Sequence, residues 1–232
     1  MAVAVVTGAS RGLGRALALA LAAQGWSLVL DARGAEALGA VAAELDGPVV
    51  ALPGDVADPA HRAELVSAAR GLGGIDLLVN NASVLGAEPL VPLAEQPLAG
   101  FAEALTVNTV APLGLVQAAL PLLRESGGAV LNISSDAAVE AYETWGGYGA
   151  TKAALDHWSA VLAQEEPGLR VWSVDPGDMR TAMYAAAVPG DDDSGRPLPE
   201  EAAVPALLEL VGSGARSGRY TVSGRTAKEW TR

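Results

Sequence analysis

Thr7-Gly8-Ala9-Ser10-Arg11-Gly12-Leu13-Gly14 is a glycine-rich turn between an apolar run, residues 2–6, and a segment of helical period, residues 12–24. Glycine permits a tight turn and lets a phosphate approach backbone N–H groups at the start of a helix. The glycine spacing is G-x-x-x-G-x-G, which differs from the G-x-G-x-x-G of most dinucleotide-binding turns. A purely structural turn would use the same residues, but the strand before it and the helix after it favour a site for a dinucleotide pyrophosphate.

The alternation of apolar runs and helical segments continues along the chain. In the first helical segment Leu13, Leu17 and Leu21 recur every four residues, and Gly25 follows its end. The later runs are continuously apolar, which is typical of strands covered on both faces. We therefore expect a three-layer, doubly wound α/β fold with a seven-stranded, mainly parallel sheet, in a single domain over residues 1–232. The expected strands lie at residues 2–6, 27–30, 49–52, 75–79, 129–133, 170–174 and 219–222.

The composition excludes several classes of function. The chain has 232 residues and a formal charge of -12, so we expect no nucleic-acid partner and no anionic membrane surface. No run of eighteen apolar residues occurs, and we expect no transmembrane helix. Because there is no cysteine and there are only two histidines, we expect no metal site and no disulfide, as suits a reducing cytoplasm. His61 follows Asp58-Pro59 at a helix start and is expected to be solvated; His157 is expected at the surface.

A second motif, Tyr148-Gly149-Ala150-Thr151-Lys152, begins another helical segment. Residues four apart share one face of a helix, so the Tyr148 phenol and the Lys152 ammonium project side by side. A free phenol has a pKa of about 10 and serves as an acid–base group near neutral pH only where a cation stabilises the phenolate. A plain surface pair is one interpretation of this spacing. The other, which we favour, is an acid–base site in which Lys152 lowers the pKa of Tyr148.

These motifs, their order and the length of the chain resemble the short-chain dehydrogenase/reductase family, single-domain enzymes with the Rossmann fold. The resemblance implies a catalytic tetrad. Ser135 precedes the tyrosine by thirteen residues, and Asn108 ends the sequence Leu105-Thr106-Val107-Asn108. Ser135 would bind the substrate carbonyl, and Tyr148 would protonate it as a hydride arrives from the nicotinamide. Lys152 would hold the ribose hydroxyls, and Asn108 would anchor a water in the proton relay.

The same resemblance implies cofactor contacts at the ends of other expected strands. Asp55-Val56 resembles the pair that contacts adenine, Asn80-Asn81-Ala82 resembles the N-N-A motif, and Pro176-Gly177-Asp178-Met179-Arg180-Thr181 resembles P-G-x-V-x-T. Ser83 departs from the pattern, because the family usually has glycine after N-N-A; we expect cofactor binding despite this change. The expected cofactor-binding residues are Gly8, Ser10, Arg11, Gly12, Leu13, Gly14, Arg33, Asp55, Val56, Asn81, Ala82, Tyr148, Lys152, Pro176, Gly177, Met179 and Thr181.

The end of the second strand bears on the choice between NAD and NADP. NAD enzymes of this fold place a carboxylate there for the adenosine ribose, whereas NADP enzymes place cations there for the 2′-phosphate. In Leu30-Asp31-Ala32-Arg33 the resemblance puts Ala32 at the carboxylate position. Asp31 stands one residue earlier and, by the period of two, faces the other way. With Arg33 next in line and Arg11 in the glycine turn, we expect NADP, and NAD is the less favoured alternative.

The substrate site is expected from two segments, one between Ser135 and Tyr148 and the other a loop over residues 182–199, a mobile surface loop or lid. The expected substrate is a small carbonyl or alcohol compound. The expected assembly is a homodimer or homotetramer joined through residues 101–123 and 153–162. A regulatory protein that only senses NAD(P) is the alternative, but such proteins usually lose the tyrosine or the lysine. The expected substrate-binding residues are Ser135, Val139, Tyr142, Trp145, Met183 and Tyr184.

Overall fold

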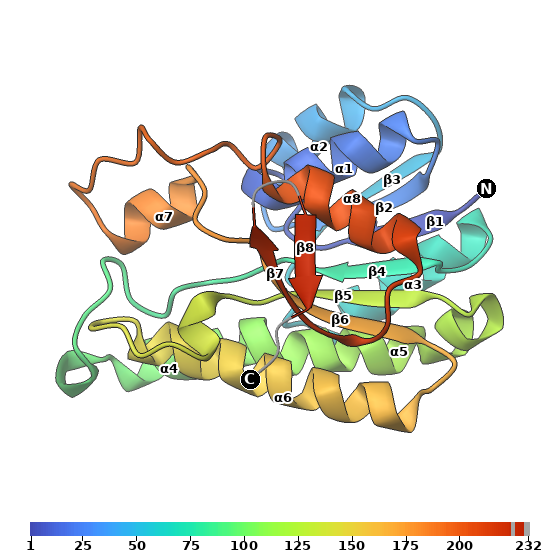
Figure 1. Ribbon diagram of the computed structural model, residues 1–232. Helices are drawn as coiled ribbons and strands as arrows, with labels where there is room; N and C mark the ends of the chain where they lie inside the picture. Colours follow the sequence, from blue (N-terminus) through green and yellow to red (C-terminus); the bar gives the residue numbers. More distant parts are fainter. Residues whose placement is uncertain (224–225, 230–232) are drawn as a thin grey trace.

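A computed structural model describes residues 1–223 and 226–229 and places one sheet between two layers of helices (Figure 1). The strands are β1 (Val3–Val6), β2 (Ser27–Ala32), β3 (Val49–Pro53), β4 (Leu77–Asn80), β5 (Ala129–Ile133), β6 (Arg170–Asp175), β7 (Gly218–Ser223) and β8 (Thr226–Glu229). They lie in the order β3-β2-β1-β4-β5-β6-β7-β8, and all neighbours are parallel except β7 and β8. The strand order reverses between β1 and β4, and ligands bind at such a point in doubly wound sheets.

Helices cover both faces of the sheet. The main ones are α1 (Gly12–Ala23), α2 (Ala35–Ala43), α3 (Pro59–Leu72), α4 (Leu98–Leu105), α5 (Ala111–Ser126), α6 (Gly146–Glu165), α7 (Ala182–Ala187) and α8 (Ala203–Ser213). In Figure 1, α1, α2 and α8 lie on one side of the sheet, and α5 and α6 lie on the other. The buried apolar side chains divide in the same way, because α1, α2 and α8 share one core cluster while α3, α5 and α6 share a second. The predicted stripe of Leu13, Leu17 and Leu21 lies in the first cluster, as expected.

The sheet has one strand more than we expected. β8 has the polar sequence Thr-Ala-Lys-Glu and pairs with β7, with Val222 opposite Ala227. The expectation of seven strands was wrong on this point because it relied on apolar runs, which a strand at the edge of a sheet does not need. β2 also runs as far as Ala32, two residues beyond the expected end.

Residues 98–126 form a continuous helical segment made of α4, a π-helical turn at Thr106–Val110 and α5. By length and composition this segment is apolar enough to cross a membrane. The sequence shows no single apolar run here, because polar residues such as Asn108 interrupt it. In the structure Leu115, Val116 and Leu122 of this segment are buried in the second core cluster. We therefore interpret it as a core helix of the domain.

Candidate active site

A cavity of about 500 Å³ lies over the carboxyl ends of β1, β2, β4, β5 and β6. Every expected cofactor-binding residue lines this cavity except Gly14. Of the expected catalytic residues, Ser135, Tyr148 and Lys152 line it, whereas Asn108 lies behind its wall. Residues far apart in the sequence therefore meet in one cavity at the edge of the sheet where the strand order predicts a ligand.

The glycine turn is held in place by Asn81, which follows β4. The Asn81 Nδ2 donates hydrogen bonds to the carbonyls of Thr7 at 2.9 Å and Gly8 at 3.2 Å. Gly8 has a φ of +66°, in the left-handed region that favours glycine. A Cβ on Gly14 would overlap the Asn81 amide and the Gly8 carbonyl. Gly14 thus serves close packing and does not line the cavity. Within the described residues, no side-chain hydrogen bond caps the N-terminus of α1.

Two arginines line the cavity where the resemblance places the 2′-phosphate. Arg11 and Arg33 are both exposed, and within residues 1–223 and 226–229 neither forms an ion pair. Ala32 is buried in the core cluster that α1 and α2 share, whereas the Asp31 side chain contacts His61 of α3. Asp31 and Ala32 thus face opposite sides of the sheet, as the period of the strand predicts.

The expectation that His61 is solvated was wrong. Only 6% of its surface is exposed, and its Nε2 lies 2.6 Å from the Asp31 Oδ1. On α3 this histidine belongs to a buried stripe with Leu65 and Ala69, each four residues further on, so the helix turns it into the protein. Burial raises the pKa of Asp31 above its usual value, and the hydrogen bond with His61 opposes that shift.

Tyr148 and Lys152 lie one turn apart on α6, and both are buried at the cavity wall. The Lys152 Nζ donates a hydrogen bond to the Ile133 carbonyl at 2.8 Å and lies 5.6 Å from the centre of the Tyr148 ring. Burial lowers the pKa of Lys152 to about 8, and the Asp156 carboxylate acts against this shift. Burial raises the pKa of Tyr148 well above its usual value, against a hydrogen bond with Ser83. The expected lowering of the Tyr148 pKa is therefore not present in the protein alone, because desolvation of the phenolate dominates.

Ser135 leads into a 3-10 turn, Asp136–Ala138, that packs against the start of α6. Its Oγ donates a hydrogen bond to the Asp136 Oδ1 at 3.0 Å and accepts one from the Ala137 N–H at 3.2 Å. Gly149 permits this approach, because a Cβ there would overlap the Ala137 carbonyl. The glycine inside the tyrosine–lysine motif thus lets the serine turn lie directly against the helix that carries Tyr148.

Asn108 occupies the π-helical turn and makes four hydrogen bonds inside the protein. Its Nδ2 donates to the Val84 carbonyl at 2.8 Å and to the Thr151 Oγ1 at 2.9 Å. Its Oδ1 accepts from the Val84 N–H at 2.9 Å and from the Ser83 Oγ at 3.1 Å. Ser83, the residue that replaces the family's usual glycine, lines the cavity together with Tyr148, and its hydroxyl opposes the rise that burial causes in the pKa of the tyrosine. The Asn108 side chain also connects to the tyrosine backbone, because the Thr151 Oγ1 donates a hydrogen bond to the Tyr148 carbonyl at 2.7 Å.

A partly buried ion pair supports the serine turn from behind, and no pattern in the sequence predicted it. The Arg219 Nη2 of β7 donates to the Ser135 carbonyl at 2.9 Å, and its Nε donates to the Asp156 Oδ2 at 2.8 Å. The Ser173 Oγ of β6 donates to the other oxygen of Asp156. Asp156 lies four residues after Lys152 on α6, on the same side of the helix, which is the one signal that could have revealed it.

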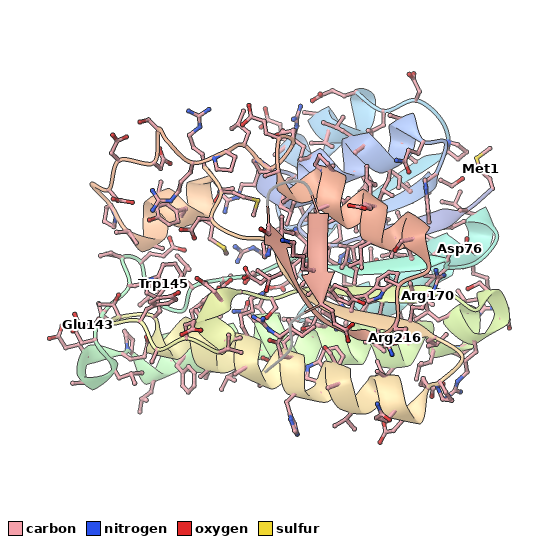
Figure 2. All side chains as sticks on the ribbon, viewed as in Figure 1. Met1, Asp76, Glu143, Trp145, Arg170 and Arg216 are labelled. Carbon is pink, nitrogen blue, oxygen red and sulfur yellow. The ribbon has the colours of Figure 1, made fainter. Side chains whose placement is uncertain are left out.

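The expected substrate residues divide into two groups. Trp145, Met183 and Tyr184 line the cavity with Ser135, whereas Val139 and Tyr142 are exposed and do not line it. Trp145 packs in a small apolar cluster with Met183 of α7, and Figure 2 shows its side chain at the end of the molecule where α7 lies. Residues 182–199, expected to form a loop, begin with the helix α7, and residues 188–199 are irregular.

Comparison with known proteins gives consistent matches over most of the chain. The model of the short chain dehydrogenase family matches residues 2–192. An uncharacterized oxidoreductase of Saccharomyces cerevisiae is 34% identical over 184 residues, which cover 78% of this chain and 72% of the relative. Serine 3-dehydrogenase of Rhizobium radiobacter is 33% identical, over 82% of this chain and 77% of the relative. The structure of an alcohol dehydrogenase of Thermococcus sibiricus, complexed with 5-hydroxy-NADP, superimposes with a TM-score of 0.86 at 28% identity, covering 99% and 100% of the two chains.

Proposed function

The chain belongs to the short chain dehydrogenase family and is an oxidoreductase of that family, and on this premise we propose that it transfers a hydride between NADP(H) and a carbonyl or secondary-alcohol substrate. The observation that carries the proposal is the placement of Ser135, Tyr148 and Lys152 on the wall of one cavity. A serine hydroxyl, a phenol and an ammonium at one wall can bind a substrate oxygen and exchange a proton with it.

The residues that line the cavity fit a dinucleotide. The absence of a Cβ at Gly14 leaves room for the Asn81 amide that holds the turn. In the part of the chain that the structure describes, the N-terminus of α1 has no side-chain cap that would compete with a pyrophosphate. The exposed guanidinium groups of Arg11 and Arg33 suit a 2′-phosphate. The alcohol dehydrogenase whose structure resembles this one was solved with an NADP derivative, which supports the same choice.

The chain's own groups would then handle the proton. Ser135 would bind the substrate oxygen, and Tyr148 would give it a proton in reduction or remove one in oxidation. Lys152 would hold the ribose hydroxyls next to the tyrosine. When bound, the nicotinamide supplies or accepts the hydride, and in its oxidised form it adds a positive charge to the site. Because burial alone raises the pKa of Tyr148, we propose that this charge and that of Lys152 together lower it in the complex.

A spectrophotometric assay tests the proposal. NADPH and NADH are compared at 340 nm with a panel of ketones, and NADP and NAD with secondary alcohols. We expect a higher kcat/KM with NADPH, and Arg33→Ala should reduce activity with NADPH far more than with NADH. Equal or better efficiency with NADH would refute the NADP assignment. Cofactor binding without turnover of any substrate would favour the sensor alternative.

We further propose that the protein acts in the cytoplasm as a homodimer or homotetramer. Support for self-association comes from exposed apolar side chains on the expected helices, with Val110 58% and Val161 42% exposed. Light scattering at micromolar concentration should give a multiple of the 23.4 kDa chain mass, and a particle of one chain mass would contradict the assembly.

A further inference from the structure

A buried acid–base pair lies next to the cofactor half of the cavity and takes no part in the chemistry proposed above. Asp31 is 1% exposed and its Oδ1 lies 2.6 Å from the Nε2 of His61. The Oδ2 of Asp31 accepts a hydrogen bond from the Gly8 N–H at 3.4 Å. The His61 ring fills the space beside Gly54, where any Cβ would overlap it. Both oxygens of the carboxylate are thus occupied by protein groups.

The position of this carboxylate matters for the cofactor. Asp31 lines the cavity next to Ala32 and Arg33, at the end of β2. A carboxylate at this edge of the sheet suits the ribose hydroxyls of NAD, and an uncompensated one repels the 2′-phosphate of NADP. Asp31 faces α3, but because it also lines the cavity, its charge would act on a cofactor bound there if it were not paired with His61. Other charged groups near the pair are the carboxylates of Asp55 and of the exposed Glu64, 4.0 Å from the His61 Nδ1.

We propose that His61 is a positioning residue for cofactor choice: by holding the Asp31 carboxylate toward α3, it keeps that carboxylate from the adenosine ribose and so favours a cofactor with a 2′-phosphate. The inference rests on the proposed preference for NADP. It differs from a role in packing alone, because packing would affect the binding of both cofactors equally. His61 acts through Asp31, so its effect must disappear when Asp31 no longer carries a charge.

The test uses two fragments that differ only in the 2′-phosphate, 5′-ADP and 2′,5′-ADP, with Kd values measured by isothermal titration calorimetry. His61→Leu and His61→Asn both remove the Nε2 partner of Asp31, so that one variant remains if the other does not fold. We expect either variant to reduce the preference for 2′,5′-ADP about tenfold, the effect of one uncompensated charge near a phosphate in a partly solvated cleft. Adding Asp31→Asn to each variant should restore the preference to within about twofold of the original protein. The matched control is His157→Gln, which changes the other histidine, on the exposed side of α6, and should leave both Kd values unchanged.

The inference is overturned if the His61 variants keep the preference, or if they weaken both fragments by the same factor. It is also overturned if Asp31→Asn fails to restore the preference. An unaltered protein that binds 5′-ADP as tightly as 2′,5′-ADP would refute the NADP assignment, and with it this inference. An unaltered protein that prefers 2′,5′-ADP, with His61 variants that do the same, would refute the inference alone.

Discussion

Replacing Arg219 with methionine tests whether the ion pair behind the serine turn supports catalysis. Methionine approximates the length of the arginine stem but has no charge and no N–H donor. The change removes the 2.9 Å hydrogen bond to the Ser135 carbonyl and the 2.8 Å contact with Asp156. The carboxylate of Asp156 then retains the hydroxyl of Ser173 but loses its guanidinium partner.

The burial of the pair sets the size of the effect. Removal of one partner from a fully buried ion pair costs about 3–5 kcal/mol. The Arg219 and Asp156 side chains are 11% and 13% exposed, so water can reach part of the carboxylate, and we expect a loss of about 2–3 kcal/mol in the free energy of unfolding. The Ser135 carbonyl loses its donor at the same time. Because a shift of about 1 Å in a positioned group can cost a factor of about 100 in rate, we expect kcat/KM to fall by about 10 to 100 times.

Urea unfolding and the 340 nm assay measure the two effects. The matched control is Arg124→Met, which breaks a bidentate contact with Glu166 at the surface; exposed pairs contribute little, so neither stability nor activity should change. The double variant Arg219→Met with Asp156→Leu should recover part of the stability but not the activity, because Ser135 still lacks its support. If Arg219→Met is as stable and as active as the Arg124 variant, the positioning role is refuted.

Three further changes test other parts of the site. Tyr148→Phe should lower turnover at least about 100-fold while the Kd for NADPH changes less than about twofold, because only the acid–base group is lost; near-normal turnover would remove the tyrosine from the mechanism. Ser83→Gly removes a hydroxyl that opposes the burial-raised pKa of Tyr148, so the rise of alcohol oxidation with pH, which follows formation of the phenolate, should move to higher pH; a shift to lower pH would contradict this sign. Gly14→Ala places a Cβ on the Asn81 amide and should weaken NADPH binding, measured by calorimetry, at least about tenfold. Gly39→Ala should leave it unchanged, because no atom of the described residues lies within 4 Å of the added Cβ.

The alternation of apolar runs and helical segments was enough to predict the fold, and two short motifs predicted residues that line the cavity. The glycine turn lies where a strand passes into a helix, and its contacts involve residues just after β1 and β4, so a short motif defines one end of the cavity. The tyrosine–lysine motif needs only the period of a helix. Both signals are short in sequence, and the doubly wound sheet brings them together because carboxyl ends of parallel strands share one edge.

The substrate side was predicted less well because its walls are irregular chain. Ser135, Trp145 and Met183 line the cavity, but Val139 and Tyr142, on the same segment as Trp145, do not. Neither helical nor strand period applies to such a segment, so sequence alone does not say which of its side chains turn inward. The strand β8 was not predicted, because a strand at the edge of a sheet does not need the continuous apolar run of a strand that helices cover on both faces.

The pairing of Asp31 with His61 has a signal in the sequence. Asp31 is the one ionisable residue in the otherwise covered strand β2, and His61 begins the buried stripe that continues with Leu65 and Ala69. The chain passes from β3 to β4 through α3, so this helix must cross over β2 and β1, which lie between them. The first turn of α3 follows the carboxyl end of β3 and therefore lies above the carboxyl end of β2, where Asp31 stands. An ionisable group at a position whose period demands burial requires a polar partner, and the crossover indicates that this partner is His61.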